Sequence, residues 1–304
     1  MRPETAIPGG APRGKLVVET PPRAKKGDQR QWPYYLMLAP LLVFLAVLFA
    51  YPMIDTLLRS VGAPDQPATL EHFSRIVARA IYLRLFGITF EIAISVSVLT
   101  LFLAYPLAYV MARARPRLLS FLMLCVLIPF FTSLLVRTYA WMVILSPVGI
   151  LNQALGFLGL GQVKLLYNRA GVLIGMTYVL LPYMVLTLYS AFRGIDPNLM
   201  LAAHNLGASD WQAFRRVFFP LSFPGVAGGF LLVFILALGF FITPALMGGD
   251  ADQMVAMVIY EHVERTLNWN FASALAVLLL VVTVLGFILY NRLVGLRVLL
   301  ESKW

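Results

Sequence analysis

Six long apolar runs constrain the fold of this chain more than any other feature. They cover approximately residues 34–56, 86–111, 118–145, 171–192, 225–247 and 271–292. Each run is long enough for a helix to cross about 30 Å of hydrocarbon at about 1.5 Å per residue. None alternates like a membrane β-barrel strand, and helices satisfy their own backbone hydrogen bonds in lipid. The sequence therefore predicts an all-α, polytopic membrane protein with six transmembrane helices in a lipid bilayer.

The composition supports one membrane domain rather than soluble domains. Hydrophobic residues make up 60% of the chain and charged residues only 12%, about half the charged share of soluble domains. Residues 1–33 are rich in proline, glycine, lysine and arginine, so we expect a disordered cytoplasmic tail before a transmembrane domain at 34–304. The net charge of +10 falls in short clusters between apolar runs, which argues against a nucleic-acid partner.

The distribution of lysine and arginine predicts the orientation. These residues are concentrated in the N-terminal tail, in the loops that follow the second and fourth runs, and after the sixth run. Cytoplasmic loops carry such an excess. We therefore expect both termini, and the loop at 193–224, to lie in the cytoplasm.

The 193–224 loop begins with the pattern of a short helix. Asp196 can cap it and Pro197 suits its first turn. Gly207 suits the left-handed position that ends a helix. Four side chains at helical spacing then form one apolar face: Leu199, Ala202, Ala203 and Leu206.

A second helix is predicted directly after Gly207. Ser209 and Gln212 have the spacing of a capping box, and we expect this helix to stop before Pro220. The result is two short helices joined at a glycine between two membrane spans. Such an element can dock into a groove of a soluble partner, or it can lie as a helical hairpin in the membrane interface.

The same loop resembles the EAA loop of bacterial ABC importer permeases, whose pattern is E-A-A-x3-G-x9-I-x-L-P. Leu201 stands where that family has glutamate. The resemblance implies the fold of a type I ABC importer transmembrane domain, with this loop as the helix that contacts the ATP-binding subunit. The positions that carry the pattern are Leu201, Ala202, Ala203, Gly207, Val217, Phe219 and Pro220.

The resemblance extends over residues 86–292. This part of the chain is similar to the first permease of spermidine/putrescine-type importers. It is carried by Tyr105-Pro106, by Pro129 through Trp141, and by Thr243 through Gly249. It implies a bacterial inner-membrane importer of polyamine or a similar small cationic or amino compound. The implied partners are a second homologous permease, two copies of an ATP-binding subunit and a periplasmic substrate-binding protein. The same permease class with an iron, opine or aminophosphonate-type substrate remains an alternative.

Charged and aromatic side chains in or near the apolar runs are candidates for a substrate path. With the predicted orientation, Glu91 and Arg137 lie at a similar shallow depth near the outer side. They can pair with each other or reach the interface, or Glu91 can meet a cationic substrate that leaves the binding protein. Asp55 is a further candidate, and Tyr139 and Trp141 are either interfacial anchors or part of the path.

The sequence contains no enzyme signature. The three histidines are scattered, and HExxH, GxSxG and Walker A patterns are absent from the chain. We therefore expect no catalytic residues, metal or cofactor, and ATP hydrolysis on a separate subunit. A secondary transporter working without ATP is the remaining alternative; such proteins often show inverted repeats, and the 193–225 motif has no second copy.

Overall fold

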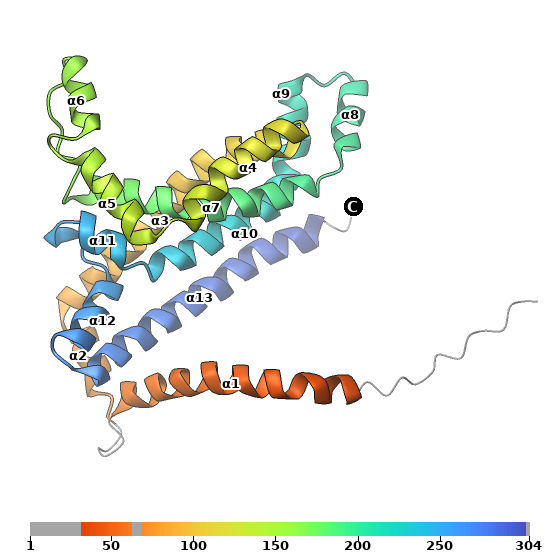
Figure 1. The fold of residues 1–304 in the computed structure, drawn as a ribbon. Coiled ribbons are helices and arrows are strands. Elements are labelled where there is room, and N and C mark those ends of the chain that lie inside the picture. The colour runs from red at the N-terminus through yellow and green to blue at the C-terminus, as the bar shows by residue number, and fades with distance from the viewer. Residues whose placement is uncertain (1–31, 63–68, 302–304) are drawn as a thin grey trace, which may run out of the picture. The chain divides into compact units, whose positions relative to one another are not determined.

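The computed structural model describes residues 32–62 and 69–301, and these are helical with short connections (Figure 1). Most of the predicted tail at 1–33 lies outside the described residues. The chain divides into two compact units, Met1–Tyr51 and Pro52–Trp304. Helix α1, Trp32–Val61, crosses this division, and its apolar side chains are largely exposed.

The second unit contains the remaining helices. In chain order they are α2 (Glu71–Ala78), α3 (Ala80–Arg113), α4 (Pro116–Phe131), α5 (Leu134–Leu145), α6 (Ile150–Phe157), α7 (Arg169–Arg193), α8 (Pro197–Asn205), α9 (Asp210–Ala213), the π-helix η1 (Phe214–Phe218), α10 (Phe219–Leu238), α11 (Ile242–Met247), the 3-10 helix η2 (Asp250–Asp252), α12 (Val255–Glu264) and α13 (Trp269–Glu301).

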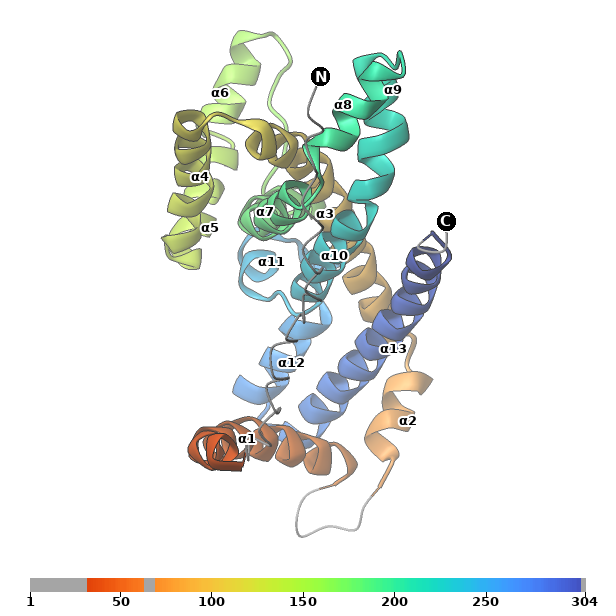
Figure 2. The same ribbon diagram turned by 90° about the vertical axis from the view of Figure 1, so that its right-hand side faces the viewer.

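Three long helices, α3, α7 and α10, form the core of this unit (Figure 2). Their shared interior is mainly apolar and includes Val96, Met176 and Leu188, each with no exposed surface. Small residues let α10 approach α7 closely: a side chain added at Gly225 would overlap Ala191. Such close contact through small residues is how membrane helices gain packing energy where no water drives them together.

The described residues contain six helical segments that are long and apolar enough to cross a membrane. The predicted number of spans is therefore confirmed, although two of the predicted spans were misplaced. The segments are Met37–Val61, Ala80–Arg113, Leu134–Phe157, Arg169–Arg193, Asp210–Leu238 and Trp269–Ile288.

The third predicted span, 118–145, is not one helix. It breaks at Thr132–Ser133, so that α4 has 16 residues and a length of about 24 Å, short of the hydrocarbon thickness. Pro129 lies in the last turn of α4, and the Thr132 hydroxyl donates to the carbonyl of Ile128 at 3.0 Å. Both features compete with continued helix formation.

The fifth predicted span, 225–247, begins earlier and ends earlier. Helix α10 starts at Phe219, ends at Leu238 and is capped by Gly239, and α11 is a separate short helix. Pro244 falls in the first turn of α11, where a missing N–H costs little. The proline that seemed to lie inside the span therefore belongs to the next helix.

Helices α3 and α7 run in the same direction, which defines two ends of the bundle. In the first half of α3, Glu91 lies beside Arg169, the first residue of α7. Near their last residues, Arg113 and Arg193 line one small pocket. Helices α8 and α9 stand at this second end and α11 at the first (Figures 1 and 2).

Candidate functional site

The predicted helix–glycine–helix element, residues 196–220, is present at the end of the bundle where α3 and α7 finish. The Asp196 carboxylate accepts from the backbone N–H of Asn198 at 2.9 Å, and Pro197 is the first residue of α8. Gly207 has a φ of +85°, the left-handed conformation that glycine adopts without strain. The predicted cap, helix and terminating glycine are confirmed.

The second helix starts as predicted but does not stop before Pro220. Ser209 and Gln212 form the capping box of α9, and the chain then passes through the π-helix η1 directly into α10. The backbone N–H of Phe219 donates to the carbonyl of Phe214, five residues back. This wider turn precedes Pro220 in the first turn of α10, where the missing N–H is tolerated. One helical segment of 29 residues therefore joins the element to the membrane-spanning helix.

The outward side of the element exposes several large apolar side chains. The exposed fractions are 61% for Leu201, 89% for Leu206 and 67% for Trp211. Met200 packs inward against the core, together with Ile195. Of the remaining family positions, Ala202, Phe219 and Pro220 are exposed, and Ala203 and Val217 are half-buried.

A polar contact spans the glycine and holds the two helices together. The ring of His204 places one nitrogen 2.7 Å from the carbonyl oxygen of Met200 and the other 2.7 Å from a carboxylate oxygen of Asp210. His204 belongs to α8 and Asp210 begins α9. This contact fixes the angle of the turn beyond what the backbone of Gly207 provides.

An aromatic cluster connects the element to the ends of α3 and α7. Phe214 and Phe218 of η1 meet Tyr109 of α3 with ring centres 5.4 and 4.9 Å apart. Phe218 also contacts Phe192 of α7 at 5.2 Å. The Arg113 guanidinium lies 3.8 Å from the centre of the Tyr109 ring, a cation–π distance.

We did not predict this cluster from the sequence. Its members are spaced four residues apart, Tyr105 with Tyr109 and Phe214 with Phe218, which places each pair on one helix face. That spacing was a usable signal, but it does not show that the two pairs face one another.

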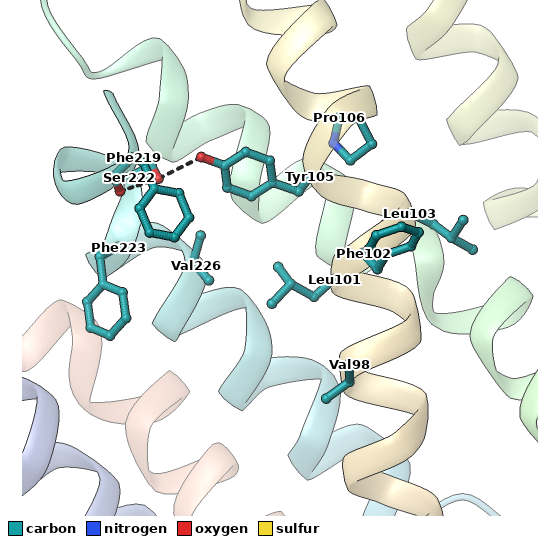
Figure 3. Close-up of a pocket in the computed structure, with 10 residues that line it drawn as sticks. All are labelled: Val98, Leu101, Phe102, Leu103, Tyr105, Pro106, Phe219, Ser222, Phe223 and Val226. Atoms are coloured by element: carbon teal, nitrogen blue, oxygen red, sulfur yellow. Dashed lines mark hydrogen bonds between the residues drawn. The ribbon is translucent and has the colours of Figure 1, made fainter. Parts of the chain in front are cut away.

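An apolar groove of about 730 Å³ lies beside this cluster, between α3 and α10 (Figure 3). The polar part of its lining consists of the hydroxyls of Tyr105 and Ser222, which are hydrogen-bonded 3.0 Å apart. Phe102 and Pro106 of α3 and Phe219 and Phe223 of α10 provide much of the apolar lining.

A polar pocket of about 610 Å³ lies at the opposite end of the bundle. Its charged lining residues are Arg84 and Glu91 of α3, Arg169 at the start of α7, and Asp252 of η2. Glu91 and Arg169 form an ion pair at 2.8 Å. We refer to this feature as the charged pocket.

Glu91 does not pair with Arg137, which was one of the alternatives that the sequence left open. The partner of Glu91 is Arg169, because α7 packs along α3 and brings its first residue beside Glu91, about three turns into that helix. Arg137 lies in α5, beyond the break that follows α4. It is half-buried, and its Nε has no hydrogen-bond partner among the described residues.

The other candidates for a substrate path do not join the charged pocket. Asp55 binds Arg59 one turn further along α1, at 2.7 Å. The Trp141 ring contacts that of Tyr178 at 5.3 Å, and Tyr139 is 54% exposed. In the described part of the chain, no group of three histidine, cysteine, aspartate or glutamate side chains is placed to hold a metal ion.

Comparison with known proteins identifies relatives over most of the chain. The "Spermidine/putrescine transport system permease protein PotB" of Haemophilus influenzae is 33% identical over 277 residues, covering 89% of this chain and 94% of the relative. The protein of the same name from Escherichia coli is 33% identical over 238 residues, covering 77% and 86%. A more distant relative is the "Inner membrane ABC transporter permease protein YdcU" of Escherichia coli, 30% identical over 219 residues and covering 67% and 70%.

A solved structure shares the fold. It is a chain of a bacterial alginate ABC transporter in complex with an alginate pentasaccharide-bound periplasmic protein, with a TM-score of 0.70, 20% identity, and coverage of 86% of this chain and 94% of that one. The family model that matches residues 104–296 describes a binding-protein-dependent transport system inner membrane component. With its six apolar helices, this chain belongs to that family of multi-pass inner-membrane permeases.

Proposed function

We propose that this chain is one transmembrane subunit of an ATP-driven importer, and that residues 196–220 bind its ATP-binding subunit. The observation that carries the proposal is the helix–glycine–helix element itself. It exposes Leu201, Leu206 and Trp211 at the tip of a helical segment that continues into the membrane-spanning helix. Apolar side chains presented by a short helix suit a groove on a soluble partner.

The contacts of the element provide a route for mechanical coupling. A displacement of α9 moves α10 directly, because η1 joins them without a break. The same displacement pushes Phe214 and Phe218 against Tyr109 of α3 and Phe192 of α7. Closing of the ATP-binding subunits is therefore transmitted to the three core helices together.

The contact with the ATP-binding subunit rests on shape and apolar burial. Leu201 occupies the position where related permeases carry glutamate, so a salt link is not formed there. Burial of apolar surface contributes about 25 cal/mol per Å². A modest contact through α8 and α9 is then enough to hold the partner.

The proposed substrate is a polyamine such as putrescine or spermidine. Two relatives of about one-third identity, covering most of this chain, carry that substrate in their names. The proposed assembly contains a second homologous permease, two ATP-binding subunits and a periplasmic binding protein. Both termini and the element then lie in the cytoplasm, and the charged pocket opens to the outside.

The test is reconstitution of the assembled complex in proteoliposomes. Uptake of radiolabelled spermidine is measured with ATP and with substrate-loaded binding protein, each omitted in turn. We expect uptake only when both are present. Uptake that continues without ATP, driven by an ion gradient, would instead establish a secondary transporter.

A further inference from the structure

We infer that the charged pocket is a binding site for a primary ammonium group of the substrate. Arg169 forms an ion pair with the Glu91 carboxylate until that ammonium replaces the guanidinium. The inference rests on the proposed polyamine import and goes further by assigning a site and an exchange of ion pairs. The pocket has a volume of about 610 Å³, which suits one end of a linear polyamine chain.

One face of α3 forms the floor of the pocket. Arg84, Gly87, Ile88 and Glu91 all line it, at the spacing of residues that share a helix face. Gly87 leaves open space beside this face of α3, because an added side chain there would meet no atom within 4 Å. The open space above Gly87 therefore belongs to the pocket.

Two carboxylates on different helices line the pocket and can bind a cation. Glu91 comes from α3, and its side chain is 64% exposed although it is paired. Asp252 comes from η2 and is 5% exposed; one of its oxygens accepts from the backbone N–H of Gly249 at 3.2 Å. An ammonium group has three N–H donors and no acceptor, so acceptor-only carboxylates are the partners that it needs, and both of these line the one pocket.

The pair between Arg169 and Glu91 is suited to exchange. The terminal nitrogen of Arg169 lies 2.8 Å from the Glu91 carboxylate but lacks the alignment of a hydrogen bond. Arg169 is also the first residue of α7, where the helix dipole disfavours a positive charge. At this nitrogen the contact with Glu91 is a charge attraction rather than an aligned hydrogen bond, and a substrate ammonium away from the helix terminus can displace it.

The exchange makes opposite predictions for the two partners of the ion pair. Binding of radiolabelled spermidine is measured on the assembled complex in nanodiscs without binding protein, and uptake is measured with it. Glu91→Gln should weaken spermidine binding by roughly tenfold to a hundredfold, the effect of losing a charged hydrogen bond. Arg169→Gln should tighten binding, because Glu91 then has no internal competitor. A purely structural ion pair would instead give both variants the same loss, and that result would overturn the inference.

Further variants keep the test independent of folding. Gly87→Leu should fill the pocket and reduce binding, whereas Gly228→Leu, also at a glycine with open space around it, should not. Asp252→Asn keeps an acceptor for Gly249 but removes the charge, and it should weaken binding. Glu261→Gln removes a carboxylate paired with an arginine outside this pocket and should leave binding unchanged.

The outcome also separates this inference from the proposed function. If the wild-type complex imports spermidine and the Glu91, Asp252 and Gly87 variants bind it normally, only the charged pocket is excluded. If the wild-type complex imports no polyamine, the proposed substrate is wrong, and the assignment of the charged pocket as its binding site is refuted as well.

Discussion

The hydroxyl of Tyr105 lies 3.0 Å from the hydroxyl of Ser222, and this contact ties α3 to the first turns of α10. Ser222 also donates to the carbonyl of Phe219 at 2.8 Å. Ser222 thus accepts from Tyr105 while it donates within its own helix. The pair lies just beyond η1, where motion of the helix–glycine–helix element would reach the membrane-spanning helices.

Replacing Tyr105 with phenylalanine should loosen this tie without disturbing the aromatic cluster. The ring contacts remain, and the lost hydrogen bond costs about 0.5–1.5 kcal/mol of stability. We expect more ATP hydrolysed per spermidine imported, measured on the reconstituted complex. Tyr109→Phe is the matched control, because no hydrogen bond of the Tyr109 hydroxyl occurs among the described residues; an equal effect of both variants would contradict a role for the contact.

Replacing Gly207 with valine should strain the turn between α8 and α9. Its φ of +85° suits glycine, and an added side chain there would meet no atom within 4 Å. The loss of folding free energy therefore comes from backbone strain. It is about 1–2 kcal/mol for an ordinary residue in the left-handed region and more for a β-branched residue.

The expected phenotype of Gly207→Val is a complex that loses its ATP-binding subunit or hydrolyses ATP without import. Gly207→Asn is the control, because asparagine tolerates the left-handed region. Co-purification of the subunit and spermidine uptake are the two measurements. Normal values of both for the valine variant would refute the proposed role of the turn.

Local sequence patterns predicted the element well because its signals act over a few residues. Asp196, Gly207 and Ser209 each satisfy backbone groups of neighbours within one turn, so their chemistry is visible in the sequence. The apparent stop at Pro220 was wrong because proline is tolerated in the first turn of a helix. Whether Phe219 begins a new helix or continues an old one depends on the π-helix before it.

The substrate-path residues were harder to predict because their partners are distant in the chain. Glu91 and Arg137 had similar calculated depths, but depth does not determine which helices are neighbours. Packing of α7 along α3 decided in favour of Arg169. Asp252 gave no signal at all, since its contribution depends on where η2 lies relative to α3.

Replacing Gly225 with leucine should separate α7 from α10. A side chain at this position would overlap Ala191, and overpacking of this kind costs about 1–3 kcal/mol. We expect a lower unfolding temperature of the purified permease complex. Gly228→Leu, three residues further along α10 with nothing within 4 Å, should leave that temperature nearly unchanged; similar losses in both would show that the helix contact is not the cause.

Cysteine labelling tests the proposed orientation. In a background where the exposed Cys125 is replaced by serine, single cysteines are placed at Leu206 in the turn after α8 and at Phe157 at the end of α6. These side chains are 89% and 92% exposed. A membrane-impermeant maleimide added to intact spheroplasts should label Phe157→Cys and not Leu206→Cys, and the reverse pattern would invert the topology.

The last prediction concerns the surface proposed to meet the ATP-binding subunit. Leu206 is 89% exposed in this chain, so Leu206→Ser should not affect folding of the permease. Burying a leucine contributes about 1.5–3 kcal/mol, and its loss should weaken association with the subunit about tenfold or more. Phe157→Ser, at the opposite end and 92% exposed, is the matched control.

Leu201→Glu, which restores the residue usual in related permeases, shows whether the groove of the partner is apolar at this position. Reduced co-purification of the ATP-binding subunit would indicate that the groove has adapted to leucine. Unchanged co-purification with Leu206→Ser would instead exclude apolar burial of α8 as the basis of the contact, and with it the proposed docking surface.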